Sequence, residues 1–237
     1  MVRKGERAMA LIFDDPKLRN RQYVFLDRTE AGKKLGQMLL TLKDESPLVL
    51  AIPAGGVPVG LEVARALEAP LDLIIIRKLP VPGNPEAGFG AITMEGDLFL
   101  NQDLVARLRL DPGTIQQIAQ EVKEELRRRD ELFRKGRPFP NLTGKTVVLV
   151  DDGLASSYTM LAAANMVRRK GASRIIVAVP TASLSSIGRL ASVVDEIYCP
   201  NIREGPFFAV ADAYRHWFDL SYQDVLTQLE GYPNHEF

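Results

Sequence analysis

Short apolar runs alternate with amphipathic stretches along most of the chain. Runs of strand length lie at 48–52, 71–76, 146–150, 174–179 and 196–199. Such nearly continuous apolar runs are typical of strands that are buried on both faces. Because helical segments separate them, the pattern predicts right-handed β-α-β crossovers. We therefore expect an α/β fold with a central, mostly parallel sheet flanked by helices.

Capping residues mark where the predicted helices begin. Asp27 and Glu30 have the spacing of a capping box, and Asp111 stands as an N-cap before Pro112 at the first helical position. Apolar residues recur at helical spacing in three segments: Ala31, Leu35, Met38, Leu39 and Leu42; Val59, Val63, Ala66 and Leu67; and Ile115, Ile118, Val122, Leu126 and Phe133. Further helices are expected over 159–170 and 185–191.

Several segments lack this periodicity. Residues 79–90 contain three prolines and three glycines and are predicted to form a long loop. A small hairpin is expected where 91–93 pairs with 98–100. Residues 1–25 show little periodicity and are expected to lie over the body of the fold. No internal repeat or linker is visible, so we expect one domain over 1–237.

Composition and charge narrow the class of protein. Of the 237 residues, 46% are hydrophobic and 25% charged, as in an average soluble protein. Thirty basic and thirty acidic side chains leave no net charge, which argues against a nucleic-acid partner. One cysteine and two histidines are too few for a structural zinc site. No apolar run approaches the roughly 20 residues of a membrane span, and no signal peptide is visible, so we expect a cytoplasmic protein without a membrane partner.

Unusual residues follow three of the predicted strands, and ligands of open parallel sheets bind outside the carboxyl ends of strands. The three segments are Pro53-Ala54-Gly55-Gly56, Arg77-Lys78 and Asp151-Asp152-Gly153. Gly55 and Gly56 allow positive φ angles and a close backbone approach, with N–H groups at the opening of a helix that suit an anion. Arg77 and Lys78 add positive charge. The small and hydroxylated stretch 153–159 precedes a second helix and suits another phosphate.

Asp151 and Asp152 are themselves anions and are poor phosphate ligands. They are suited to accept hydrogen bonds from sugar hydroxyls or to lie close to Mg²⁺. Taken singly, the glycine pair is also typical of a turn, the aspartate pair of an exposed turn or an N-cap, and the Arg-Lys pair of a solvated surface. Taken together, the three segments predict a ligand that carries two phosphate groups across a ribose.

Residues 147–159, Val-Val-Leu-Val-Asp-Asp-Gly-Leu-Ala-Ser-Ser-Tyr-Thr, resemble the phosphoribosyl pyrophosphate (PRPP) signature of type I phosphoribosyltransferases. The signature consists of apolar residues, two acids and a small, hydroxylated loop. The resemblance extends over about 25–229 and includes the Pro-x-Gly-Gly loop and the Arg-Lys pair. The tail is similar to that of bacterial phosphoribosyltransferases of unassigned substrate through Phe208, Ala209, Val210, Tyr214, Phe218 and Asp219.

The resemblance implies a role for each matched position. Asp151 and Asp152 are expected to bind the ribose hydroxyls and to lie near Mg²⁺ through ribose or water, and with Lys78 they form the expected catalytic set. The rest of the PRPP site is expected to consist of Gly153, Leu154, Ala155, Ser156, Ser157, Tyr158 and Thr159. Pyrophosphate is expected to contact Ala54, Gly55, Gly56, Arg77 and Lys78, and the first three often include a non-proline cis peptide in this family.

The implied fold has a core over about 25–200, with hood or flap elements from 1–24, 79–100 and 201–237. The flap, through 79–92, is expected to close over the reaction. The implied activity is transfer of the phosphoribosyl group from PRPP to a nitrogenous base, with Mg²⁺ as cofactor and pyrophosphate released. A homodimer is also expected, since Phe207 and Phe208 are apolar residues of the kind found at interfaces.

Four positions depart from the family pattern. Ser157 replaces the usual glycine, Tyr158 a small residue and Ala54 an arginine. Ala155 stands where 6-oxopurine enzymes of the family carry an aspartate, so hypoxanthine or guanine is disfavoured as acceptor. The departures leave an alternative open, a non-catalytic regulatory protein that binds PRPP or a nucleotide without turnover. The sequence does not identify the acceptor base or the hood residues.

Other ligand-binding classes fail on specific residues. A P-loop reading of 139–146 has Phe139 where the first glycine belongs. Gly88-Phe89-Gly90 lacks the third glycine of a dinucleotide fingerprint and opens no helix. The last lysine, Lys170, comes too early for a phospho-receiver domain, and no Gly-x-Ser-x-Gly elbow supports a serine hydrolase.

Overall fold

The central sheet has six strands, and each neighbouring pair runs parallel. The computed structural model describes residues 8–230 and 232. In spatial order the strands are β1 (Leu11–Phe13), β10 (Glu196–Tyr198), β8 (Arg174–Ala178), β7 (Thr146–Val150), β2 (Leu48–Ala51) and β3 (Leu71–Leu73). β2 and β7 are direct neighbours, with Ala51 opposite Val150. The segments that follow these two strands therefore emerge side by side.

Helices cover both faces of this sheet, which explains the continuous apolar runs. Val148 and Val150 of β7 pack with α1 (Arg28–Met38) and α2 (Gly56–Leu67). Val147 and Leu149 point to the other face and pack with α5 (Tyr158–Arg169) and α6 (Leu184–Leu190). The predicted mostly parallel α/β fold is confirmed. The predicted start of α1 is also confirmed, because the Asp27 side chain accepts a hydrogen bond from the Glu30 N–H.

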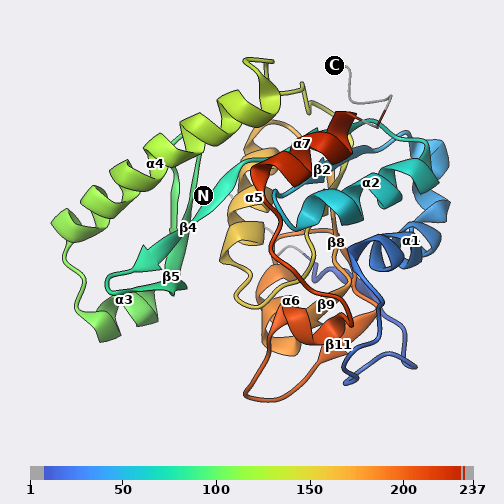
Figure 1. Cartoon of the computed structure of the whole chain (residues 1–237), viewed down its shortest axis with the longest axis horizontal. Helices are drawn as coiled ribbons and strands as arrows, with labels where there is room; N and C mark the ends of the chain where they lie inside the picture. Colours follow the sequence, from blue (N-terminus) through green and yellow to red (C-terminus); the bar gives the residue numbers. More distant parts are fainter. Residues whose placement is uncertain (1–7, 231, 233–237) are drawn as a thin grey trace, which may run out of the picture.

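A separate lobe projects from one side of the main body (Figure 1). It consists of an antiparallel sheet of β4 (Ile76–Val81), β5 (Asn84–Thr93) and β6 (Leu98–Leu100), with α3 (Gln102–Leu108) and α4 (Pro112–Arg134). The expected hairpin of 91–93 with 98–100 is confirmed. Asp111 caps α4 through the N–H groups of Gly113 and Thr114, as its position before Pro112 predicts.

Two expectations for this region are wrong. The apolar run 71–76 is not one strand, because β3 ends at Leu73 and β4 begins at Ile76 in the other sheet. Residues 79–90 are not a long loop but belong largely to the β4–β5 hairpin, whose pairing is irregular around Pro80. Irregular pairing lets proline enter a strand without losing a regular ladder hydrogen bond. Proline and glycine content alone did not reveal this strand pair.

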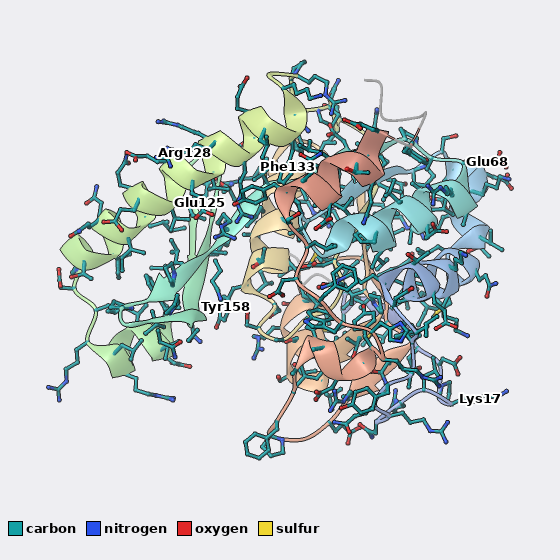
Figure 2. The ribbon with its side chains drawn as sticks, viewed as in Figure 1. Lys17, Glu68, Glu125, Arg128, Phe133 and Tyr158 are labelled. Atoms are coloured by element: carbon teal, nitrogen blue, oxygen red, sulfur yellow. The ribbon has the colours of Figure 1, made fainter. Side chains whose placement is uncertain are left out.

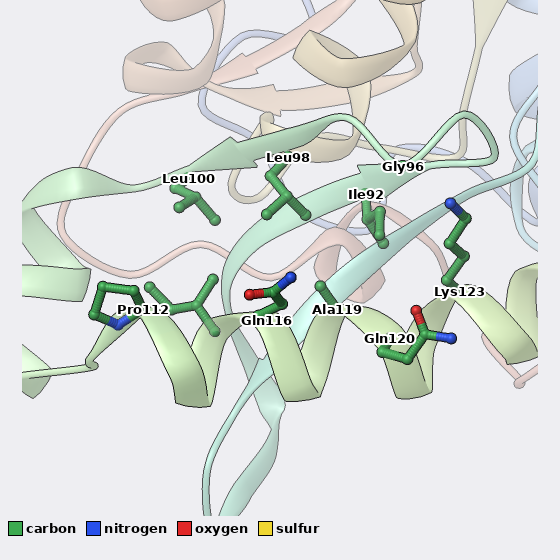
Figure 3. A pocket seen from close by; sticks show the side chains of 10 residues that line it. Ile92, Gly96, Leu98, Leu100, Pro112, Gln116, Ala119, Gln120 and Lys123 are labelled. Carbon is green, nitrogen blue, oxygen red and sulfur yellow. The ribbon is translucent and has the colours of Figure 1, made fainter.

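A cavity of about 480 Å³ lies between the lobe sheet and α4 (Figure 3). Its walls are mainly apolar and consist of Ile92, Gly96, Leu98, Leu100, Pro112, Ile115, Gln116, Ala119, Gln120 and Lys123. None of the residues expected to bind a phosphorylated sugar lines it. It is therefore separate from the strand ends of the central sheet.

Two segments that are far apart in the sequence, 25–26 and 214–216, lie side by side. Phe25 forms a parallel bridge with Tyr214, and the N–H groups of Arg215 and His216 donate to the carbonyls of Phe25 and Leu26. The remaining elements are β9 (Thr181–Ser183), β11 (Asn201–Arg203), α7 (Tyr222–Glu230) and the 3₁₀ helices η1 (Leu40–Glu45) and η2 (Val210–Ala213).

The expected core boundary near residue 25 omitted one element of the central sheet. The omitted element is β1, the edge strand of the sheet. It has only three residues, which are too few to produce a periodic pattern in the sequence. The parts of the expected hood at 1–7, 231 and 233–237 lie outside the described residues. Within the described part of the chain, no helix combines the length and the apolar character needed to cross a membrane.

Candidate functional site

The segments after β2 and β7 are in direct contact. The Ile52 N–H donates to the carbonyl of Val150 at 2.9 Å, and the Pro53–Ala54 peptide bond that follows is cis. A Cβ on Gly55 would lie 2.0 Å from Asp152 Oδ2, and one on Gly56 would lie 2.8 Å from the Val150 carbonyl oxygen. The two glycines are thus needed for close approach to the aspartate segment.

The expected positive φ at these glycines is wrong. Gly55 has a φ of −59°, and Gly56 is already the first residue of α2. We also expected the N–H groups at this helix start to be open to an anion. Two of them are not, because the N–H groups of Gly56 and Val57 donate to the carbonyls of Ile52 and Ala54. The loop is therefore braced by its own backbone.

Replacing Gly55 with alanine is expected to displace the Asp152 side chain, because an alanine Cβ and Oδ2 cannot both keep their places. We expect a loss of about 1–3 kcal/mol in the free energy of unfolding, measured by denaturant titration. Gly188→Ala is the matched control, since a Cβ in that α6 position meets nothing within 4 Å; it is expected to stabilise by about 0.5–1 kcal/mol. Equal stability of Gly55→Ala and the parent chain would contradict the contact.

Asp152 forms a largely buried ion pair that the sequence analysis missed. Its Oδ2 lies 2.8 Å from Arg28 Nε, and the two side chains are 14% and 8% exposed. Arg28 Nη1 donates to the Phe218 carbonyl at 2.9 Å, and the guanidinium carbon lies 3.9 Å from the centre of the Trp217 ring. Arg28 thereby joins the aspartate segment, Asp151-Asp152-Gly153, to the C-terminal segment, residues 210–218. One signal was present: an arginine in the first turn of a helix opposes the helix dipole.

The C-terminal segment also covers the aspartates from another side. The Tyr214 hydroxyl donates to the Asp152 carbonyl at 2.6 Å. A Cβ on Gly153 would lie 2.5 Å from a methyl carbon of Val210. Residues far apart in the sequence therefore enclose one short segment after β7.

Burial controls the electrostatics of the aspartate pair. Burial, together with the charge of Asp152, raises the pKa of Asp151 well above its ordinary value. Burial also raises the pKa of Asp152, but the Arg28 guanidinium opposes this increase. Asp152 is therefore the more readily ionised of the two. Burial and the nearby Asp152 charge raise the pKa of Tyr214, which keeps its hydroxyl a donor.

The segment after the aspartates turns sharply into α5, one residue before the predicted start. Ser157 has a φ of 61°, the left-handed conformation, which costs a residue with a Cβ roughly 1 kcal/mol or more. Its hydroxyl accepts a hydrogen bond from Arg189 Nε at 3.1 Å and makes no capping bond to α5. Ala155 and Ser156 are exposed, whereas Ser157 is buried.

Arg77 and Lys78 do not follow a strand of the central sheet, contrary to expectation. They lie within β4, because the chain leaves the central sheet after Leu73. Arg77 Nη2 lies 2.9 Å from Glu125 Oε1 of α4, inside the lobe, and the Lys78 side chain is exposed. Figure 2 shows Glu125 in the lobe and Tyr158 on the side of the main body that faces it. Two of the three expected segments meet, and the third belongs to the neighbouring lobe.

Asp151 and Asp152 are candidate ligands for Mg²⁺. No group of three or more histidine, cysteine, aspartate or glutamate side chains suited to a metal occurs among the described residues. Mg²⁺ characteristically keeps several waters and binds one or two carboxylates together with substrate phosphates. The Asp151–Asp152 pair fits an ion that arrives with a phosphorylated ligand, with Asp151 better placed than the Arg28-bound Asp152.

Comparison with known proteins decides the family. The model of the phosphoribosyl transferase domain matches residues 28–209, which include both contacting segments. The chain belongs to the phosphoribosyltransferase family. The expected family and the expected fold are both confirmed by this match.

Individual relatives support the assignment of the chain to the phosphoribosyltransferase family. Two curated Mycobacterium tuberculosis proteins, whose names give a phosphoribosyl transferase assignment as provisional, are each 41% identical over 207 residues and 87% of this chain. The match covers 46% of each, so the chain spans about half the length of these relatives. A crystal structure of a Thermus thermophilus protein has a TM-score of 0.71 and 36% identity, covering 88% of this chain and 98% of that one.

Proposed function

We propose that this phosphoribosyltransferase-family chain binds PRPP with Mg²⁺ and transfers its phosphoribosyl group to a nitrogenous base, releasing pyrophosphate. The observation that carries the proposal is the partly buried Asp151–Asp152 pair packed against the Gly55–Gly56 loop. Carboxylates at this place suit ribose hydroxyls, and the start of α5, which no side chain caps, suits a phosphate. No other pair of segments combines these features in the described part of the central sheet.

The 5′-phosphate is assigned to the turn into α5. The first N–H groups of an α-helix have no intrahelical acceptor, and anions bind there. Ser157 does not cap these groups, since its hydroxyl is turned toward Arg189. The exposed residues Ala155 and Ser156 and the following Tyr158 and Thr159 would surround the phosphate, with Gly153 and Leu154 joining it to the ribose contacts.

Pyrophosphate is assigned to Ala54, Gly55 and Gly56, whose loop contacts both aspartates. Displacement at the sugar carbon builds positive charge on the ring and negative charge on the leaving group. Mg²⁺ would supply positive charge for the departing phosphates. Asp151 and Asp152 would orient the ring, and the lobe would bring Lys78, and Arg77 if it leaves Glu125, toward the pyrophosphate while excluding water.

The second candidate is a regulatory protein that binds PRPP or a nucleotide without turnover. It is favoured by the Arg77–Glu125 ion pair, which holds one expected pyrophosphate cation within the lobe, and by Ala54, which supplies no charge. The two candidates share the aspartate site. They differ in whether pyrophosphate leaves.

Pyrophosphate release from PRPP and Mg²⁺, measured across a panel of pyrimidine, purine and other nitrogenous bases, tests the proposal. An enzyme gives release with at least one base, and release is abolished in the Asp151→Asn/Asp152→Asn double variant. Saturable PRPP binding with no release for any base would instead establish the regulatory candidate. Because Ala155 replaces an aspartate, we expect the lowest release with hypoxanthine and guanine.

The expected homodimer stays a prediction. Phe207 is 87% exposed, consistent with an apolar contact between copies, whereas Phe208 is half-buried and packs against the guanidinium of Arg203. Sedimentation equilibrium of the parent chain and of Phe207→Ser would show whether copies associate through this residue.

A further inference from the structure

Ser157 occupies a backbone conformation that its side chain disfavours. Its φ of 61° belongs to the left-handed region, where glycine is the ordinary residue because it has no Cβ. The residue is only 3% exposed, so its hydroxyl must find a partner inside the protein. That partner is Arg189, on the helix behind the turn.

Arg189 and its neighbours hold this turn at two points. Arg189 Nε donates to the Ser157 hydroxyl at 3.1 Å, and Nη2 donates to the Ser186 hydroxyl at 3.3 Å. Ser186 in turn donates to the Ala155 carbonyl at 2.9 Å. One guanidinium thus reaches both ends of the 155–157 segment, directly at Ser157 and through Ser186 at Ala155.

We propose that Arg189 is a positioning residue for the phosphate-binding turn. It holds Ser157 in the left-handed conformation, and so supplies by a side-chain contact what glycine would supply by conformational freedom. The part of this inference that concerns the ligand rests on the proposed function. The geometry of the turn and the contact between Ser157 and Arg189 are independent of the proposed function.

A double-substitution cycle between Arg189→Ala and Ser157→Gly tests the inference. In the parent chain, Arg189→Ala is expected to weaken PRPP binding about tenfold, raising KM with kcat changed less than about twofold if the chain turns over. In the Ser157→Gly background, the same substitution is expected to change binding by less than about twofold, because glycine adopts the conformation unaided. Arg189→Lys should fall between, since one ammonium cannot reproduce the planar two-point contact.

Equal weakening by Arg189→Ala in both backgrounds would overturn the inference, since Arg189 would then act independently of Ser157. Arg169→Ala is the control: this arginine lies on α5 but pairs with Asp97 of the lobe, and it should show no coupling to Ser157→Gly.

Thermal unfolding separates failure of this inference from failure of the proposed function. Arg189→Ala should lower Tm in the parent chain and not in the Ser157→Gly background, whether or not PRPP binds. If PRPP fails to bind the parent chain, the proposed function fails, and the Tm cycle alone decides whether Arg189 positions the turn. Additive Tm changes would reject it.

Discussion

Asp151→Asn is expected to weaken PRPP binding about 100-fold while raising the thermal stability of the unliganded protein at neutral pH. Asparagine keeps an oxygen that can accept the Asp152 N–H, as Asp151 Oδ1 does at 2.9 Å. It lacks the charge that would accept ribose hydroxyls strongly and attract a metal, and charged hydrogen bonds contribute about 1.5–3 kcal/mol each. Calorimetric titration of PRPP measures the loss.

The stability gain follows from the raised pKa of Asp151. Below the ordinary pKa of 3.8 the carboxyl is neutral in both states, so the parent and the variant should be equally stable. As pH rises past that value the unfolded chain releases its proton first, and the parent loses stability until the higher folded pKa is passed. We expect Asp151→Asn to have a higher Tm than the parent at pH 7, but not at pH 3.

The control for this pair of measurements is Asp44→Asn, an exposed aspartate on the 3₁₀ helix η1. It should leave PRPP binding unchanged. Asp151→Asn that binds PRPP as tightly as the parent would remove this carboxylate from the site. If Asp151→Asn is less stable than the parent at neutral pH, the negative charge of Asp151 stabilises the folded protein instead of destabilising it.

Arg28→Met is expected to lower the free energy of unfolding by about 3 kcal/mol, the largest stability loss among these substitutions. Methionine keeps an apolar stem but leaves Asp152 buried without its counter-charge and the Phe218 carbonyl without its donor. Trp217 is the one tryptophan of the chain, and it lies against the Arg28 guanidinium. Its emission should therefore change in the folded variant, which makes fluorescence-detected denaturation the natural measurement.

A second substitution shows whether the lost stability belongs to the ion pair. Adding Asp152→Asn to Arg28→Met removes the unpaired charge, and we expect it to restore more than half of the loss. Lys43→Met is the control, because Lys43 pairs with Glu68 at an exposed site and its loss should cost less than about 1 kcal/mol. Additive losses in the double variant would mean that Arg28 stabilises the fold mainly through Trp217 and Phe218.

The central sheet was predictable because burial on both faces leaves a strong signal. Strands such as β7 read as continuous apolar runs, and the caps at Asp27 and Asp111 depend on local spacing. The lobe was not predictable in the same way. The break between Leu73 and Ile76 interrupts neither hydrophobicity nor β propensity, so a change of sheet leaves no trace in the pattern.

The site shows the same division between local and long-range information. The contact between Gly55 and Asp152 followed from the rule that parallel strands end at one edge. Arg28 could not be found this way, because its partners Asp152 and Phe218 lie far along the chain and are brought to it only by the complete fold. Arg77 was misplaced for the converse reason, since an apolar run was taken to continue in one sheet.

Calorimetric titration of the parent chain with PRPP, with and without Mg²⁺, tests the central claim most directly. The aspartate–glycine site predicts saturable binding of one PRPP per chain that weakens at least tenfold when Mg²⁺ is removed, with ribose 5-phosphate binding more weakly than PRPP. Absence of binding to the folded parent chain at millimolar PRPP and Mg²⁺ would contradict the claim that these two segments form a site for a doubly phosphorylated sugar.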